Sequence, residues 1–242
     1  MPGYRRFSEA SVSEKMLDTM FLLSIGIGYL FAMVHLFYSH QGRDGHPGLS
    51  VEDVRIAYYG EHQQTRLGAA LNGAMGANLH LPEQKQIILN WMDKGSKKDV
   101  YESDVQPILS SNCIMCHSPA SGMGLPPLDS YENVLKLTQT DTGASAQSLV
   151  RVSHIHLFGI SFILFLLGRI FLLCEMPRMV KRITVAIPFL AMFLDILSWY
   201  VTKILPEFAL VVVMSGALMG VSIMVQIMVS LYQMWLYKPQ AS

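Results

Sequence analysis

The chain has 242 residues, of which 51% are hydrophobic and 15% are charged. Soluble domains carry about 25% charged residues, so this composition argues against a purely cytosolic enzyme. The 18 Lys and Arg residues balance the 18 Asp and Glu residues, which excludes a strongly basic surface for nucleic acid. Three cysteines cannot build a disulfide framework.

The first apolar segment covers residues 16–38 and follows a polar N-terminal stretch, residues 1–15. About 20 apolar residues in a helix cross a hydrocarbon core about 30 Å thick, so this segment is predicted to span a membrane. It is too long for the apolar region of a cleaved signal peptide, and no small-residue cleavage site follows it before Tyr38. His35 lies near its C-terminal end.

A polar segment, residues 39–151, separates the first span from the others. Between residues 41 and 150 it carries 8 Lys and Arg against 12 Asp and Glu, a net charge of −4. This length is enough for a small domain with a core of its own. We therefore expect a folded domain inserted between the first two spans.

The polar segment contains the motif Cys113-Ile114-Met115-Cys116-His117. C-x-x-C-H is the attachment motif of c-type haem, because two thiols can react with the two vinyl groups while the adjacent imidazole binds the iron. Residues 101–109 are predicted to form one or two amphipathic helical turns that lead into the motif. A thioredoxin-type dithiol belongs in a βαβ context and a structural zinc site needs four ligands, and neither pattern is visible.

A short part of the chain resembles a known family. The motif, followed by Gly124-Leu125-Pro126-Pro127-Leu128-Asp129-Ser130-Tyr131-Glu132, is similar to the haem segment of membrane-associated bacterial monohaem cytochromes c, such as the planctomycete-type cytochromes. The resemblance implies an all-α cytochrome domain with covalent haem c that transfers electrons.

A second stretch is similar to the distal-Met loop and C-terminal helix of a cytochrome c. It comprises Asn72-Gly73-Ala74-Met75, Leu81-Pro82-Glu83 and residues 87–95. In cytochromes c this part follows the haem motif, whereas here it precedes it. Either the inserted domain is permuted, or residues 49–95 form a degenerate half without haem and residues 101–150 form the haem-binding half.

His117 is the expected proximal ligand of the haem iron, and the identity of the distal ligand stays open. Met75 fits a permuted domain, and Met123 lies six residues after His117. His154 and His156 follow the domain where the chain re-enters the membrane. Since 16 methionines make any single one a weak candidate, a histidine of the second span is preferred. Four further histidines are interpreted as surface or structural residues: His40, His46, His62 and His80.

Three more apolar segments, residues 152–174, 183–201 and 208–236, are predicted to span the membrane. Basic residues mark the cytoplasmic side of a span, and an N-terminus inside places seven of them there. They are Arg5, Arg6, Lys15, Arg178, Lys181, Arg182 and Lys238. Both termini are then cytoplasmic and the inserted domain faces the periplasm of a bacterial inner membrane, where haem is attached to apocytochromes.

Ionisable residues near the outer interface suggest a second site within the membrane. His35, His154 and His156 are expected at similar depth, and Asp195 lies one or two turns deeper. Such residues are costly in a bilayer and usually mark a functional path or a pairing. They could bind haem b or a metal ion, or handle the protons of a quinone.

The sequence therefore predicts an all-α protein, a four-helix membrane bundle with an inserted extracytoplasmic cytochrome c-like domain. We expect an electron-transfer subunit rather than a stand-alone enzyme. Its expected partners are other membrane redox subunits or a periplasmic electron carrier, and the lipid bilayer, without nucleic acid. A quinol-oxidising subunit is the alternative function.

Overall fold

The computed structural model of the chain describes residues 6–123 and 125–237, without the side chain of Ala74. Arg5, Gly124 and Lys238, which entered the interpretation of the sequence, lie outside the described residues. The chain divides into two compact units. Residues 1–39 and 145–242 form a membrane unit, and residues 40–144 form a polar unit.

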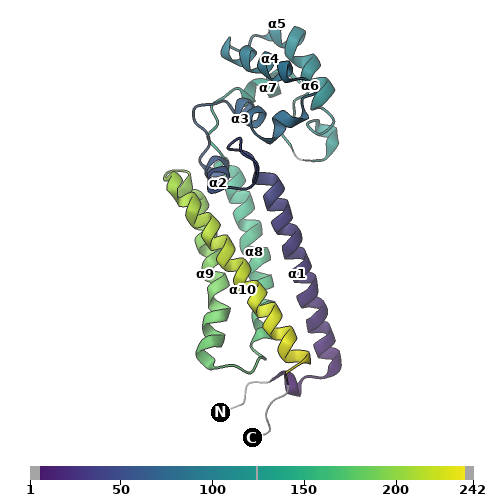
Figure 1. Cartoon of the computed structure of the whole chain (residues 1–242), viewed down its shortest axis with the longest axis vertical. Helices are drawn as coiled ribbons and strands as arrows, with labels where there is room; N and C mark the ends of the chain where they lie inside the picture. The colour runs from purple at the N-terminus through teal and green to yellow at the C-terminus, as the bar shows by residue number, and fades with distance from the viewer. Residues whose placement is uncertain (1–5, 124, 238–242) are drawn as a thin grey trace. The chain divides into compact units, whose positions relative to one another are not determined.

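The membrane unit contains the four long helices α1, α8, α9 and α10 (Figure 1). Each is long and apolar enough to cross a membrane, which confirms the prediction of four spans. Two single 3-10 turns, η1 (Phe7–Glu9) and η5 (Pro206–Phe208), precede α1 and α10. The four helices have these bounds: α1 Val12–His40, α8 Ala146–Phe171, α9 Arg178–Thr202 and α10 Ala209–Trp235.

Local capping sets where the second span begins. The side chain of Ser145 accepts a hydrogen bond from the amide of Ser148, so α8 starts six residues before the expected residue 152. His154 and His156 consequently lie about two turns or more inside the helix rather than close to its start. The helix also ends at Phe171, and Cys174 lies in the turn that follows.

Helices α8, α9 and α10 pack against one another, and α1 contacts α10. The indole Nε1 of Trp235 donates to Thr19 Oγ1 at 2.9 Å, and the hydroxyl of Tyr29 lies against the backbone of Gly220. The face of α10 that is buried in the unit carries polar as well as apolar side chains. The buried polar residues of α10 are Ser215, Ser222, Gln226 and Ser230.

The polar unit is built of short helices and turns. Among the described residues its β-type pairing is a single bridge between Thr65 and Thr140. Around this bridge, residues 57–66 pair with residues 139–144 through four backbone hydrogen bonds of 2.8–3.0 Å. This pairing joins the segment between α2 and α3 to the C-terminal end of the unit. The helical elements are α2 Val51–Tyr58, α3 Arg66–Asn72, η2 Ala74–Asn78, α4 Pro82–Asp93, α5 Lys98–Val100, η3 Tyr101–Val105, α6 Gln106–Asn112, η4 Pro119–Ser121 and α7 Tyr131–Leu137.

One hydrophobic core joins both halves of the polar unit. Leu67, Leu71, Ile88 and Trp91, from α3 and α4, pack with residues that precede and follow the Cys-x-x-Cys-His motif. Those partners are Tyr101, Val105, Ile108, Leu109, Leu128 and Val134. The segments 49–95 and 101–150 therefore share one core in this structure. The motif lies at its edge, since Cys113 and Ile114 pack against the same cluster.

Candidate functional site

The Cys-x-x-Cys-His motif forms a tight turn directly after α6. The amides of Cys113 and Ile114 both donate to the carbonyl oxygen of Leu109, a hydrogen-bond pattern of helix ends. The amides of Cys116 and His117 both donate to the carbonyl oxygen of Cys113, at 3.1 and 2.9 Å. The imidazole thus projects from a turn that follows the helix leading into the motif.

Both thiols of the motif are free and half-buried. Burial, and then the neighbouring Cys116, raises the pKa of the Cys113 thiol above its ordinary value. Met115, between the two cysteines, is 87% exposed, so the outer side of the turn faces solvent. The turn therefore has one side on the core and one side open.

His117 is oriented by the segment that follows it. Its Nδ1 lies 2.8 Å from the carbonyl oxygen of Pro126. Because a carbonyl oxygen can only accept, Nδ1 is the donor of this bond, and in the neutral ring the lone pair is then on Nε2. The amide of Leu128 in turn donates to the carbonyl oxygen of His117 at 2.9 Å, which holds residues 126–128 against the motif.

A buried tyrosine belongs to the hydrophobic core that Cys113 and Ile114 also contact. Tyr101 is 2% exposed, and its hydroxyl has no hydrogen-bond partner among the described residues. The Tyr101 ring contacts the rings of Trp91 and Tyr131. The polar atoms of these two neighbours have partners, because Trp91 Nε1 donates to Lys97 O and Tyr131 Oη donates to Ser96 O. A buried polar atom without a partner is unusual and requires an explanation, such as a bound group.

Tyr101 also begins a π-helical turn, Tyr101–Val105, between α5 and α6. In this turn the amide of Gln106 donates to the carbonyl oxygen of Tyr101. Pro107 follows and has no amide proton to continue a regular ladder, which accounts for the wider turn at this point. Such turns are frequent at functional sites.

Both methionines considered as the distal ligand of the haem iron have exposed side chains in the polar unit. Met75 lies in η2, is 45% exposed, and is approached by the side-chain amide of Asn78, which also donates to its carbonyl oxygen. Met123 is 60% exposed and lies in the loop between the motif and Pro126.

The histidines expected near the membrane interface belong to the membrane unit and differ in exposure. His154 faces outward on α8 and His35 is exposed on α1, where its ring lies 3.5 Å from Ser39 Oγ. His156 is half-buried, and its ring meets the edge of Trp199 at a centroid distance of 5.4 Å. Its Nδ1 lies 3.0 Å from the carbonyl oxygen of Val152.

Asp195 connects to His156 through Trp199. The Nε1 atom of Trp199 donates to Asp195 Oδ1 at 3.3 Å, and Ser215 Oγ approaches the same oxygen at 3.4 Å. Of the four residues expected to form a membrane site, the structure therefore links Asp195 with His156. His35 and His154 are exposed on their own helices.

His80 was interpreted from sequence as a surface or structural residue; its side chain is exposed, and its backbone lies beside the residue that precedes the motif. Its backbone amide donates to Asn112 Oδ1 at 3.2 Å, and Asn112 immediately precedes Cys113. The two residues are 32 positions apart in the chain. The sequence near His80 does not predict its contact with Asn112. The only local hint is Pro82, which marks the start of a helix and so places His80 at the end of a loop.

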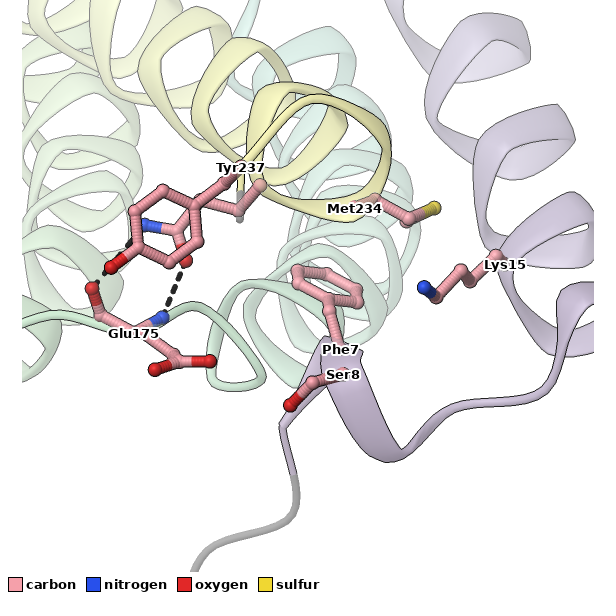
Figure 2. A pocket seen from close by; sticks show the side chains of 7 residues that line it. Phe7, Ser8, Lys15, Glu175, Met234 and Tyr237 are labelled. Carbon is pink, nitrogen blue, oxygen red and sulfur yellow. Dashed lines mark hydrogen bonds between the residues drawn. The ribbon is translucent and has the colours of Figure 1, made fainter. Parts of the chain in front are cut away.

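Clusters of metal-ligating side chains and pockets away from the motif are the other places where a ligand could bind. Among the described residues no three His, Cys, Asp or Glu side chains gather as a group that could hold a bare metal ion. A pocket of about 210 Å³ lies in the membrane unit where α1 begins and α10 ends (Figure 2). None of the predicted site residues lines it; its walls are Phe7, Ser8, Lys15, Glu175, Gln233, Met234 and Tyr237.

Comparison with known proteins finds a similarity for the C-terminal part of the chain. A family model described as a transmembrane helical domain matches residues 137–241, which include α8, α9 and α10. No curated protein and no solved structure is similar enough to match the chain, and no cytochrome c family matches it. The family match and the four apolar helices together identify a multi-pass membrane protein.

Proposed function

We propose that this chain is a membrane-bound c-type cytochrome that passes single electrons as a subunit of a larger membrane redox complex. Cys113 and Cys116 would hold the haem through two thioether bonds, each formed by adding a thiol S–H across a vinyl double bond. His117 would ligate the iron. Haem bound in this way supplies one-electron chemistry.

The observation that carries this proposal is the hydrogen bond between His117 Nδ1 and Pro126 O. Histidines that ligate metals commonly donate their other ring N–H to a carbonyl or carboxylate, which fixes the tautomer and the ring orientation. Here that bond leaves Nε2 to coordinate.

Two features favour haem attachment over a redox dithiol. Reactive dithiols have a low thiol pKa, commonly at the N-terminus of a helix. Cys113 instead follows the C-terminal end of α6, and its thiol pKa is raised by burial. A half-buried thiol with a raised pKa does not match the low-pKa thiol of a redox dithiol.

The proposed location follows from charge and from the chemistry of the motif. The polar unit would face the periplasm of a bacterial inner membrane, with both termini in the cytoplasm. Its electron partners would be other membrane redox subunits or a periplasmic carrier.

The test is the full-length protein expressed in a host with cytochrome c maturation. We expect a c-type pyridine haemochrome spectrum, haem stain after denaturing electrophoresis, and an intact mass raised by one haem. Cys113→Ser with Cys116→Ser should abolish the stain, whereas the matched control Cys174→Ser should retain it. A colourless wild-type protein with the mass of the bare chain would overturn the proposal.

A quinol-oxidising subunit is the second candidate, supported by the link from His156 through Trp199 to Asp195. This role predicts that a quinol reduces the haem and that His156→Ala abolishes the reduction. His154→Ala, on the exposed side of the same helix, is the control and should leave the rate unchanged. Equal reduction rates in both variants would exclude His156 from a quinol site.

A further inference from the structure

The segment of residues 74–81, called here the ligand loop, contacts the end of helix α6 through His80. At its C-terminal end, the amide of His80 donates to Asn112 Oδ1 at 3.2 Å. The side chain of Asn112 is itself fixed, since its Nδ2 donates to the carbonyl oxygen of Ile108 at 2.7 Å. His80 is therefore fastened to the residue directly before Cys113.

A second contact holds the same part of the loop. Leu79 packs against the hydrophobic core that Cys113 and Ile114 also contact. On the other side of His80, Pro82 starts α4 and limits the backbone there. The backbone at residues 79–80 is thus held next to the motif, while the imidazole of His80 is exposed.

The other candidates in the polar unit are less well held. Met75 lies near the start of the ligand loop, and its described side-chain contact is the amide of Asn78 within that loop. Met123 lies between His117 and Pro126, and Pro126 binds the Nδ1 edge of the imidazole, which points away from a coordinated iron. Met123 itself is 60% exposed, and its amide donates to Ser121 Oγ at 3.4 Å.

We propose that His80 is the second axial ligand of the haem iron, opposite His117. This inference rests on the proposed function and deepens it, because it names the residue that completes the iron coordination. A neutral imidazole donates a lone pair to the iron, and a histidine at this position gives a lower reduction potential than a methionine. Asn112 is the positioning residue, since it holds the His80 backbone and not the imidazole.

The experiment compares the haem spectra of the full-length protein and its variants. His80→Gly should retain covalent haem stain but lose the low-spin spectrum of a six-coordinate haem, and added imidazole should restore it. His46→Gly, which also removes an exposed imidazole from the polar unit, is the matched control and should keep the wild-type spectrum. Asn112→Ala should bind carbon monoxide more readily in the reduced state than wild type.

A conservative variant keeps the test independent of folding. His80→Met retains a ligand at the same position, so we expect a six-coordinate haem with a raised reduction potential. The proposal is overturned if His80→Gly and His80→Met both keep the wild-type spectrum and potential. Loss of the low-spin state in Met75→Leu or His156→Gly would then identify the ligand instead. Absence of covalent haem from the wild-type protein would instead refute the proposed function.

Discussion

The side-chain Nε2 of Gln226 donates to the carbonyl oxygen of Thr184 at 2.9 Å, between helices α10 and α9. In a regular helix that carbonyl would accept from the amide of residue 188, which is Pro188 and has no amide proton. Gln226, which is 1% exposed, therefore supplies the donor that the proline removes. A backbone carbonyl left without a partner in lipid is costly.

Replacing Gln226 by Leu should destabilise the membrane unit by about 1–2 kcal/mol, because it leaves the Thr184 carbonyl unsatisfied. The same replacement in a Pro188→Ala background should cost less, since an alanine at this position restores an amide donor to Thr184. Chemical denaturation of the purified protein in detergent measures both differences. Equal losses in the two backgrounds would show that Gln226 does not compensate for Pro188.

The second prediction concerns the carboxyl group of Asp195. Asp195→Asn and Asp195→Leu both remove the carboxyl group, but only Asn keeps an oxygen that can accept from Trp199 Nε1 and Ser215 Oγ. We expect the Leu variant to be less stable than the Asn variant by about 1–3 kcal/mol, the cost of leaving a buried donor without its acceptor. Thermal unfolding in one detergent compares them. A Leu variant as stable as the Asn variant contradicts the assigned hydrogen bonds.

The third prediction concerns the backbone that closes the polar unit. Gly143 has φ +68° and lies so close to residues 58–60 that a Cβ would overlap the carbonyl oxygen of Tyr58. Gly143→Ala should therefore destabilise the polar unit by at least about 1 kcal/mol, through strain and overlap together. Gly122→Ala is the matched control, because Gly122 also has φ +68° but has open space where the Cβ would lie.

Limited proteolysis of the full-length protein measures this effect, since cleavage within residues 40–144 reports opening of that unit. We expect faster cleavage in Gly143→Ala than in Gly122→Ala. The reverse order would mean that the pairing of residues 57–66 with 139–144 does not hold the unit closed.

The fourth prediction is a pH dependence of thiol alkylation before haem attachment. Burial raises the pKa of Cys113, so a smaller fraction is thiolate at neutral pH than for an ordinary thiol. In the apoprotein with Cys116→Ser and Cys174→Ser, iodoacetamide should react with Cys113 more slowly than with N-acetylcysteine. The midpoint of the rate against pH should lie at a higher pH for Cys113. A midpoint at or below that of the free thiol would exclude the burial effect.

The site illustrates how far sequence patterns reach. The spacing of Cys113, Cys116 and His117 predicts a haem ligand set because the pattern is local and chemically specific. The orientation of the His117 ring depends on Pro126, nine residues later, and on the return of the chain through Leu128. His80 received no functional interpretation, since its partner Asn112 is 32 positions away and only packing brings the two together.

The sequence by itself determined the four membrane spans, because a run of apolar residues of sufficient length is a local property that the bilayer selects directly. It did not determine that Gln226 would satisfy Thr184, or that residues 49–95 would share one core with the motif. Those relationships were decided by the tertiary structure. They arise from contacts between side chains distant in the chain, and the free energy of such contacts depends on the packed arrangement rather than on any local pattern of residues.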